Sequence, residues 1–153
     1  DERFPARRPE EPIPGSRVRA TTPQGSITVD EIAAMQPGGA RIMDEVAHRV
    51  WVLYYAAKAG NWDLARYMVK ESEKALGFLA KTRPKYAQDL EAFIREDFGP
   101  VLQAIAAKEW EAFERAFRQA VDASDVYHGK YNKPFLRFRL PDSPPEWFDL
   151  SPR

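Results

Sequence analysis

Proline divides this chain into three parts. Five of its 13 prolines fall in residues 1–23 and five more in residues 134–152, whereas residues 38–133 contain only Pro84 and Pro100. Proline lacks the backbone N–H that helix interiors and sheet ladders need. We therefore expect both ends to be extended arms and the regular structure to lie between them.

The middle of the chain has the periodicity of amphipathic helices. Between residues 41 and 58, apolar side chains recur at spacings of three and four, which places them on one helical face; they are Ile42, Val46, Val50, Leu53 and Ala57. Gly60 is placed to end this helix, and Asn61 to cap the next one. Similar patterns predict a second helix that stops before Pro84, a third over about 85–107 and a fourth over about 109–129.

These helices predict an all-α fold. The third helix is expected to kink or split at Gly99-Pro100. The corners before Trp62 and Trp110 look alike, with Ala-Ala-Lys ending at Lys58 in one and at Lys108 in the other. Short connections make sequential helices antiparallel neighbours.

The predicted architecture is therefore an antiparallel up-down-up-down four-helix bundle with proline-rich arms. The bundle spans residues 39–130. An extended N-terminal arm spans 1–38, and a C-terminal tail spans 131–153, packed on the bundle or on a partner.

Composition excludes several classes of function. The 153 residues suffice for one domain. The 23 basic and 23 acidic residues cancel, so the chain has no strong field for nucleic acid, and no apolar run reaches the length of a membrane span. Without cysteine, the chain has no disulfide, thiolate zinc site, cysteine nucleophile or thioether-linked cofactor.

The histidines are the candidate metal ligands. Glu45-x-x-His48 and Asp125-x-x-His128 have the spacing of half di-iron motifs, which would need further inward glutamates, and Glu71 is the one candidate. We interpret these residues as solvated helix faces and predict no metal site. No nucleophile or catalytic arrangement stands out, so the sequence favours a non-catalytic function and leaves enzyme activity open.

His128 also lies 11 residues after Phe117, which returns it to the apolar stripe of the fourth helix. Position alone favours a structural histidine near the terminal carbonyls.

A resemblance to a known family gives His128 a second interpretation. Ser124-Asp-Val-Tyr-His128 closes the fourth helix where four-helix c-type cytochromes, cytochrome c-prime and its relatives, carry Cys-x-x-Cys-His. Other similar segments are Arg41-Ile-Met43, Ala59-Gly-Asn-Trp-Asp-Leu-Ala65, Ala106-Ala-Lys-Glu109, Ala112-Phe113, Ala116-Phe117, Phe135 to Pro141 and Trp147-Phe148. Together they cover roughly residues 40–150, and the chain resembles a member of this superfamily that has lost its haem-attachment cysteines.

The resemblance implies roles for particular residues. His128 matches the proximal haem ligand, and Met43 matches a distal ligand by its place on the first helix. Ser124 and Tyr127 replace the two cysteines, so haem cannot be attached covalently. The resemblance also implies a periplasmic or secreted location.

The space that haem would occupy in such a cytochrome must then be filled in another way. A cofactor pocket measures roughly 300–1,000 Å³, and a dry void of that size is too costly to keep at about 24 cal/mol per Å³. We expect side chains to have refilled it, Tyr127 among them. Further bulk is available from the aromatic residues Trp51, Tyr54, Tyr55, Phe113 and Phe117.

Three functions remain open on the sequence. The first is a non-catalytic, haem-less bundle that acts as an interaction or accessory subunit, binding a protein partner or a second copy through its arms. The second is an electron carrier that holds haem without covalent bonds, with Met43 and His128 as axial ligands. The third is a binder or enzyme for a small aromatic or apolar ligand in the bundle pocket, with His128, Tyr127 or His48 handling protons.

Overall fold

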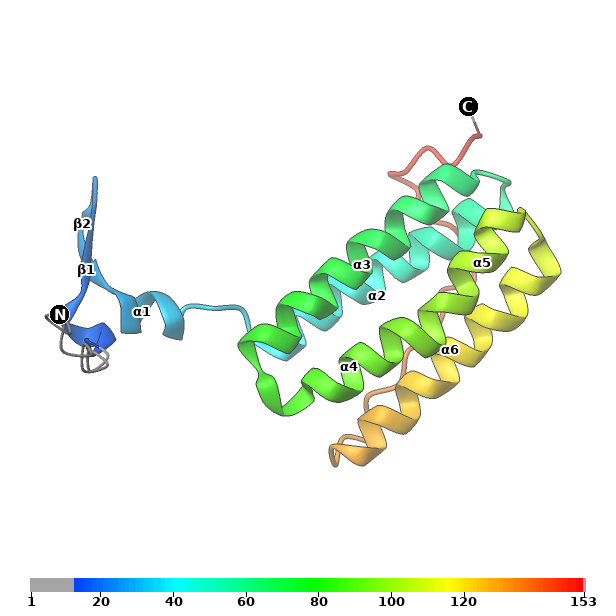
Figure 1. Cartoon of the computed structure of the whole chain (residues 1–153). Helices are drawn as coiled ribbons and strands as arrows, with labels where there is room; N and C mark the ends of the chain where they lie inside the picture. The colour runs from blue at the N-terminus through cyan, green and yellow to red at the C-terminus, as the bar shows by residue number, and fades with distance from the viewer. Residues whose placement is uncertain (1–12, 153) are drawn as a thin grey trace, which may run out of the picture. The chain divides into compact units, whose positions relative to one another are not determined.

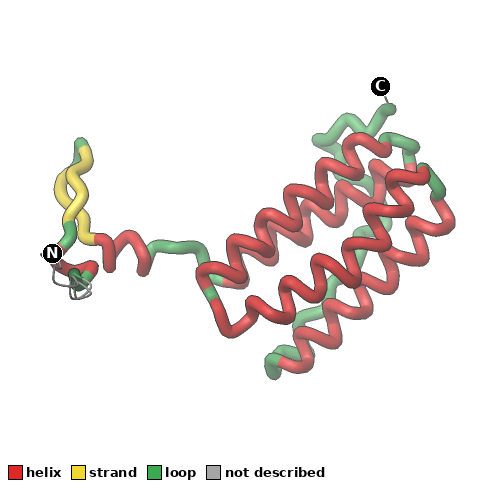
Figure 2. Tube along the Cα trace, in the orientation of Figure 1, coloured by secondary structure: helices red, strands yellow, loops and turns green. Residues whose placement is uncertain are grey.

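The structure, a computed structural model, describes residues 13–152 and divides the chain into two compact units, Asp1–Pro37 and Gly38–Arg153. The chain is mostly helical, as predicted, with one small two-stranded sheet (Figures 1 and 2). Residues 1–12 of the expected N-terminal arm, and Arg153, lie outside the described residues.

The N-terminal unit differs from the extended arm that its prolines predict. A 3₁₀ turn, η1 (Gly15–Arg17), precedes an antiparallel hairpin of β1 (Arg19–Thr22) and β2 (Gly25–Thr28). The short helix α1 (Val29–Ala34) follows directly. Pro23 falls in the hairpin turn, where its missing N–H interrupts no ladder, and threonine favours the strands. Proline frequency alone therefore gave the wrong local structure here.

Local polar contacts define this unit. Thr28 and Glu31 form a capping box at the start of α1, because the Thr28 hydroxyl accepts from the Glu31 N–H at 3.1 Å and the Glu31 carboxylate accepts from the Thr28 N–H at 2.7 Å. Thr28 is the only buried residue between residues 13 and 37. The described part of the N-terminal unit therefore has no hydrophobic core.

The long helical rods of the second unit lie side by side (Figure 1). They are α2 (Gly39–Lys58), α3 (Trp62–Thr82), a composite rod and α6 (Trp110–Lys130). A 3₁₀ turn, η2 (Pro84–Tyr86), leads into the composite rod, which consists of α4 (Ala87–Phe93), the π-helical segment η3 (Ile94–Phe98) and α5 (Gly99–Ala107). The predicted helices are confirmed to within a few residues.

Phe113 is the centre of an aromatic core. Its side chain is fully buried, and its ring centroid lies 5.7 Å from that of Trp110 and 5.8 Å from that of Phe117. The rings of Trp62 and Tyr54 follow at 6.2 and 6.3 Å. Aromatic pairs at these distances stabilise a core beyond the area that they bury. This cluster lies at the end of the rods where α3 and α6 begin.

The expected break at Gly99-Pro100 takes the form of a π-helical segment. Residues 87–107 stay helical throughout, and Ile94–Phe98 adopt the wider i→i+5 turn immediately before Gly99. Pro100 cannot donate to a carbonyl in the preceding turn. A π segment accommodates that interruption without a loop, and it turns Phe98 into the core, where only 4% of it is exposed.

The two corners that start α3 and α6 share one backbone motif. In the first, the N–H of Asn61 donates to the carbonyl of Ala56 and Gly60 has φ +80°. In the second, the N–H of Glu109 donates to the carbonyl of Ala104, and Lys108 has φ +57°. Both are Schellman ends. Lys108 thus occupies the position of Gly60, so the match of Lys108 with Lys58 read from the sequence is wrong by two residues.

We predict opposite effects of exchanging the residue type at the two corners. Lys108→Gly should raise the free energy of unfolding by about 1 kcal/mol, because a left-handed conformation costs a side-chain-bearing residue about that much. Gly60→Lys should lower it by a similar amount, since a Cβ there meets open space and only the backbone is strained. Urea unfolding followed by circular dichroism measures both, and a loss of stability in Lys108→Gly would contradict the assignment.

Candidate functional site

The sequence-predicted ligands lie at one end of the second unit. Met43 is in the second turn of α2, and Tyr127 and His128 are in the last turn of α6. The start of α2 and the end of α6 lie at the same end of the unit, because both lie near the end of α3. A Cβ on Gly39 of α2 would lie 3.8 Å from Leu79 near the end of α3, and Lys130 of α6 is ion-paired with Asp89, which lies shortly after α3 in the chain. All three predicted residues are partly buried.

A polar clamp fixes the end of α6 that carries His128. The Asp89 carboxylate on α4 accepts from the Lys130 ammonium at 2.7 Å and from the Tyr131 hydroxyl at 2.6 Å. The Tyr131 ring also meets the Tyr86 ring edge-on at 4.6 Å. The Asp89 carboxylate accepts a hydrogen bond from the Tyr131 hydroxyl, and this bond raises the pKa of Tyr131 to about 12. The bond from Lys130, and next that from Tyr131, lowers the pKa of Asp89.

Tyr127 faces the composite rod. Its ring lies 6.0 Å from that of Phe93, edge to face, and Phe93 lies 4.8 Å from Phe98 in the π segment. Burial, followed by the negative charge of Asp97, raises the pKa of Tyr127. Ser124, which the resemblance aligns with a cysteine, donates to the carbonyl of Val121 at 2.7 Å. Tyr127 therefore has a packing role and Ser124 a hydrogen-bonding role in this structure.

The bulk near Tyr127 differs from the set proposed on the sequence. Tyr54, Phe113 and Phe117 belong to the aromatic core at the opposite end of the rods. Trp51 and Tyr55 contact the C-terminal tail instead. Phe93 and Phe98 are the aromatic neighbours at the Tyr127 end. The π segment that turns Phe98 inward has no sequence signal beyond Pro100, so the position of Phe98 could not be predicted.

Two buried polar atoms on α6 have no hydrogen-bond partner within the described part of the chain. They are Oδ1 of Asp125 and Nδ1 of His128. The expected bond from His128 to terminal carbonyls is therefore not made through Nδ1. Such atoms in a native protein call for a water, an ion or a catalytic role.

The residues with di-metal spacing are not brought together. Glu45 accepts from Arg49 at 2.6 Å, and Glu71 is paired with Lys74. No group of three or more histidine, aspartate or glutamate side chains within residues 13–152 could hold a metal ion.

The structure reveals a second candidate region, where the C-terminal tail lies on α2. The indole N–H of Trp51 donates to the carbonyl of Ser143 at 2.9 Å, and the Tyr55 hydroxyl donates to the carbonyl of Pro141 at 2.7 Å. Residues 141–147 run antiparallel to α2, and the chain then reverses, so that Asn61 donates to Ser151 at 3.0 Å. We call residues 141–151 the tail strap. The sequence signal for it was an aromatic row on α2 wider than one core face, together with prolines in the tail.

A three-ring cluster holds the middle of the tail strap. The Trp147 ring stacks on His48 at 5.2 Å with an interplanar angle of 28°, and it meets Trp51 edge-on at 5.2 Å. Trp147 itself is 61% exposed. His48, Trp51 and Tyr55, which we call the aromatic ladder, therefore contact the tail strap through three successive turns of α2.

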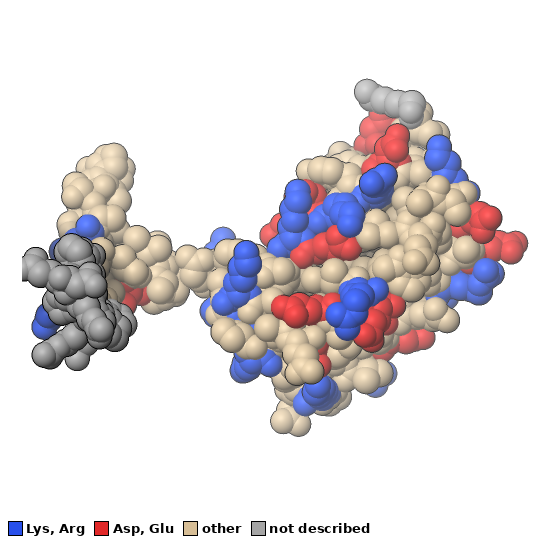
Figure 3. Space-filling view, viewed as in Figure 1, with Lys and Arg blue, Asp and Glu red and all other residues tan. Residues whose placement is uncertain are grey.

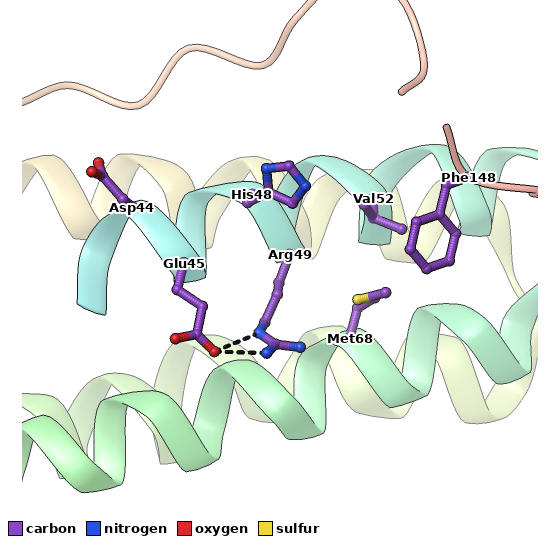
Figure 4. A pocket seen from close by; sticks show the side chains of 7 residues that line it. All are labelled: Asp44, Glu45, His48, Arg49, Val52, Met68 and Phe148. Carbon is purple, nitrogen blue, oxygen red and sulfur yellow. Dashed lines mark hydrogen bonds and ion pairs between the residues drawn. The ribbon is translucent and has the colours of Figure 1, made fainter. Parts of the chain in front are cut away.

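A hollow of about 350 Å³ lies beside the ladder, between α2 and α3 (Figure 4). Its lining consists of Asp44, Glu45, His48, Arg49, Val52, Met68 and Phe148. Figure 4 shows Phe148 of the tail strap next to Val52 and Met68, with the Arg49–Glu45 pair at the opposite side. This hollow is on the surface and includes none of Met43, Tyr127 and His128.

The surface carries both signs of charge. On the face seen in Figure 3, Lys and Arg side chains of the second unit alternate with Asp and Glu. This face shows no single-sign patch of the kind that binds phosphate backbones. Over residues 13–152, none of the helices has the combined length and apolarity that crossing a membrane requires.

We predict that Asp89→Asn loosens the clamp in a pH-dependent way. Because the folded protein lowers the pKa of Asp89, the carboxylate adds stability above its unfolded pKa of about 3.9, and this is lost as pH falls through the lower folded pKa. The urea midpoint of Asp89→Asn should thus lie below that of the wild type at pH 7, and the gap should narrow as pH falls through the lowered pKa of Asp89. Asp122→Asn, an exposed change on α6, is the control. A gap that persists unchanged at pH 2 would refute the electrostatic cause.

No family model matches this chain, and neither a curated protein nor a solved structure shows significant similarity to it. The likeness to four-helix cytochromes therefore stays a prediction from the segments named above.

Proposed function

We propose that this protein is a non-catalytic, haem-less bundle of the cytochrome c-prime type that acts as an interaction or accessory subunit through its terminal segments. The short connections between successive rods, such as Ala59–Asn61 and Lys108–Glu109, support the up-down-up-down arrangement. The side-chain roles of Ser124 and Tyr127 support a bundle that functions without attached haem. The same resemblance favours a periplasmic or secreted location.

The N-terminal unit is the observation that carries this proposal. It has defined strands and a capped helix, yet no core within the described residues. Two-stranded hairpins are marginal in water without a surface to pack on. Its exposed large apolar side chains are Ile13, Val18, Val29, Ile32 and Met35, of which Ile13 and Met35 are 71% exposed. A unit of this composition is suited to burying its apolar side chains against another protein.

The C-terminal tail has the same character. Phe135 is 76% exposed, Leu136 43% and Trp147 61%. By contrast, the exposed large apolar residues on the long helices are Tyr67, Phe78 and Val126. Exposed apolar side chains that gather on particular segments mark interaction sites, whereas scattered single ones are ordinary. The terminal segments are thus the favoured contact surfaces.

We predict that changing the N-terminal unit weakens complex formation. The tagged protein, isolated from its native host, should elute with a partner at fixed stoichiometry by size-exclusion chromatography with light scattering. Ile32→Ser combined with Met35→Ser should weaken that complex by about tenfold or more, since each removes apolar contact area. Tyr67→Ser combined with Phe78→Ser on α3 is the matched control and should leave it intact. A monomeric protein whose N-terminal unit is cleaved freely under every condition would refute the proposal.

Non-covalent haem binding is the second candidate, and one observation favours it. His128 Nδ1 is buried without a partner among the described residues, and Met43 lies at the same end of the rods. The surroundings do not fit a porphyrin, however. Phe93 packs against Tyr127, and two surface hollows, of about 350 and 380 Å³, are lined by residues other than Met43 and His128. The third candidate, a small apolar ligand inside the bundle, has no such observation in its favour.

We predict that equimolar hemin produces no Soret shift with the purified protein. The expected reason is that aromatic side chains occupy the space between the two candidate ligands. Absorption spectra of the wild type and of His128→Ala provide the measurement and its control. A Soret band that appears with the wild type and disappears in His128→Ala would replace the accessory function with haem binding.

A further inference from the structure

The outer edge of strand β1 carries free backbone hydrogen-bonding groups. Along an antiparallel hairpin, pairs that exchange hydrogen bonds across the two strands alternate with pairs that do not. The N–H of Val29 donates to the carbonyl of Val18 at 3.0 Å, and this pair precedes the pair of Arg19 with Thr28. The bonded series therefore begins at Val18. By the same alternation, the N–H and C=O groups of Arg19 and Thr21 point away from β2.

These four groups have no hydrogen-bond partner within the part of the chain that the structure describes. All four residues of β1 are exposed. The free stretch is bounded by the turn η1 before it and by Pro23 after it, and proline has no N–H to offer. The edge thus presents two donors and two acceptors, placed symmetrically on either side of Ala20.

The edge of β2 is already occupied inside the N-terminal unit. Its outward N–H at Thr28 donates to the Glu31 carboxylate at 2.7 Å, and both α1 and η1 pack beside β2. Proteins protect open strand edges with proline, bulges, charges or a covering segment. Strand β1 has a regular register and no proline. Its one charged residue, Arg19, donates to the Ser26 hydroxyl at 2.6 Å, which directs the guanidinium toward β2 and away from the free edge.

We propose that β1 pairs antiparallel with β1 of a second copy of this chain, so that two hairpins form one four-stranded sheet about a two-fold axis at Ala20. Arg19 of each copy exchanges hydrogen bonds with Thr21 of the other, and this uses all the free groups on both edges. The inference rests on the proposed function and deepens it, because it names a second copy as the partner of the N-terminal unit.

The shape of the edge identifies the occupant. The fitting strand presents two outward residues on either side of a small central one, and β1 itself does so. In this register Arg19 lies opposite Thr21, and Ala20 lies opposite Ala20. A shift of two residues in one direction places Arg19 opposite Arg19, where like charges destabilise the pair. A shift in the other direction places Arg19 opposite Pro23, which cannot donate.

Pairing also extends an apolar face that one hairpin leaves exposed. Directly paired residues of two strands lie on the same face, so Val18, Ala20, Ile27 and Val29 share one face of the hairpin. Val18 is 42% exposed and Val29 43%. In the four-stranded sheet the two apolar faces become continuous. A two-stranded hairpin is marginal in water, whereas a larger sheet with an apolar face is stable.

Cysteine cross-linking of the full chain tests the proposal, because the sequence contains no cysteine. The two Ala20 residues form a pair without hydrogen bonds, whose Cα atoms lie about 4.5 Å apart, within reach of a disulfide. Ala20→Cys should therefore form a covalent dimer with oxidised glutathione, measured by non-reducing electrophoresis. Ser26→Cys, also exposed but on β2, is the matched control. Its two copies lie three strand spacings apart, about 14 Å, and should not cross-link.

Proline substitution tests the hydrogen bonds of the edge. Thr21→Pro removes an outward N–H and spares the hairpin ladder, since proline is tolerated where the N–H faces away from the sheet. Sedimentation equilibrium should show a dimer of the wild type and self-association at least about tenfold weaker for Thr21→Pro. Ser26→Pro makes the same change on the edge of β2 and should leave the dimer intact.

Hydrogen exchange of the wild type keeps the test independent of any variant. The amides of Arg19 and Thr21 should become protected as the protein concentration rises, because only pairing between copies uses them. A wild type that stays monomeric throughout the concentration series would overturn the proposal. So would equal cross-linking of Ala20→Cys and Ser26→Cys, or a dimer that Thr21→Pro leaves unaltered.

Failure of this inference is distinguishable from failure of the accessory function. A monomeric wild type that still elutes with a different host protein, in a complex weakened by Ile32→Ser and Met35→Ser, rejects the pairing of edges and keeps the accessory function. A dimer that cross-links through Ala20→Cys and retains no other host protein keeps the pairing of edges and rejects the accessory function.

Discussion

Helix α2 carries more apolar surface than its neighbouring helices cover. Ile42, Val46 and Val50 face the core, where α2 packs chiefly on α3. His48, Trp51 and Tyr55 form a second row that the other rods leave accessible. A helix that is apolar on more than one face must be covered on more than one face. The tail strap supplies that cover, and the position of the C-terminal segment follows from this constraint.

The regular parts of the fold could be predicted because their causes are local. A spacing of three and four residues fixes the core face of α2, and Gly60 and Asn61 mark a helix end and a cap by their own chemistry. The misses have causes that are not local or are ambiguous. Lys108 takes the left-handed corner position because the surrounding helices demand a turn there, although lysine does not favour it. The hairpin of Arg19–Thr28 was hidden because proline in a turn and proline in an extended arm give the same count.

The sequence located the candidate ligands on their helices, but it did not predict which side chains surround them. Periodicity placed His128 on the inner stripe of the last turn of α6, and its ring nitrogen Nδ1 is indeed buried. Its neighbours depend on the π segment of the facing rod, which shifts the helical register by one residue and turns Phe98 inward. A change of register alters every contact beyond it. For this reason the inward position of Phe98 was not predicted from the sequence.

The tail strap combines order with few specific contacts, and this has a thermodynamic consequence. Its described residues form no helix or strand, so their backbone polar groups depend on water and on donors from α2 and Asn61. Prolines reduce the entropy that ordering removes, because the free segment is already restricted. A small number of hydrogen bonds and ring contacts is then enough to hold the strap.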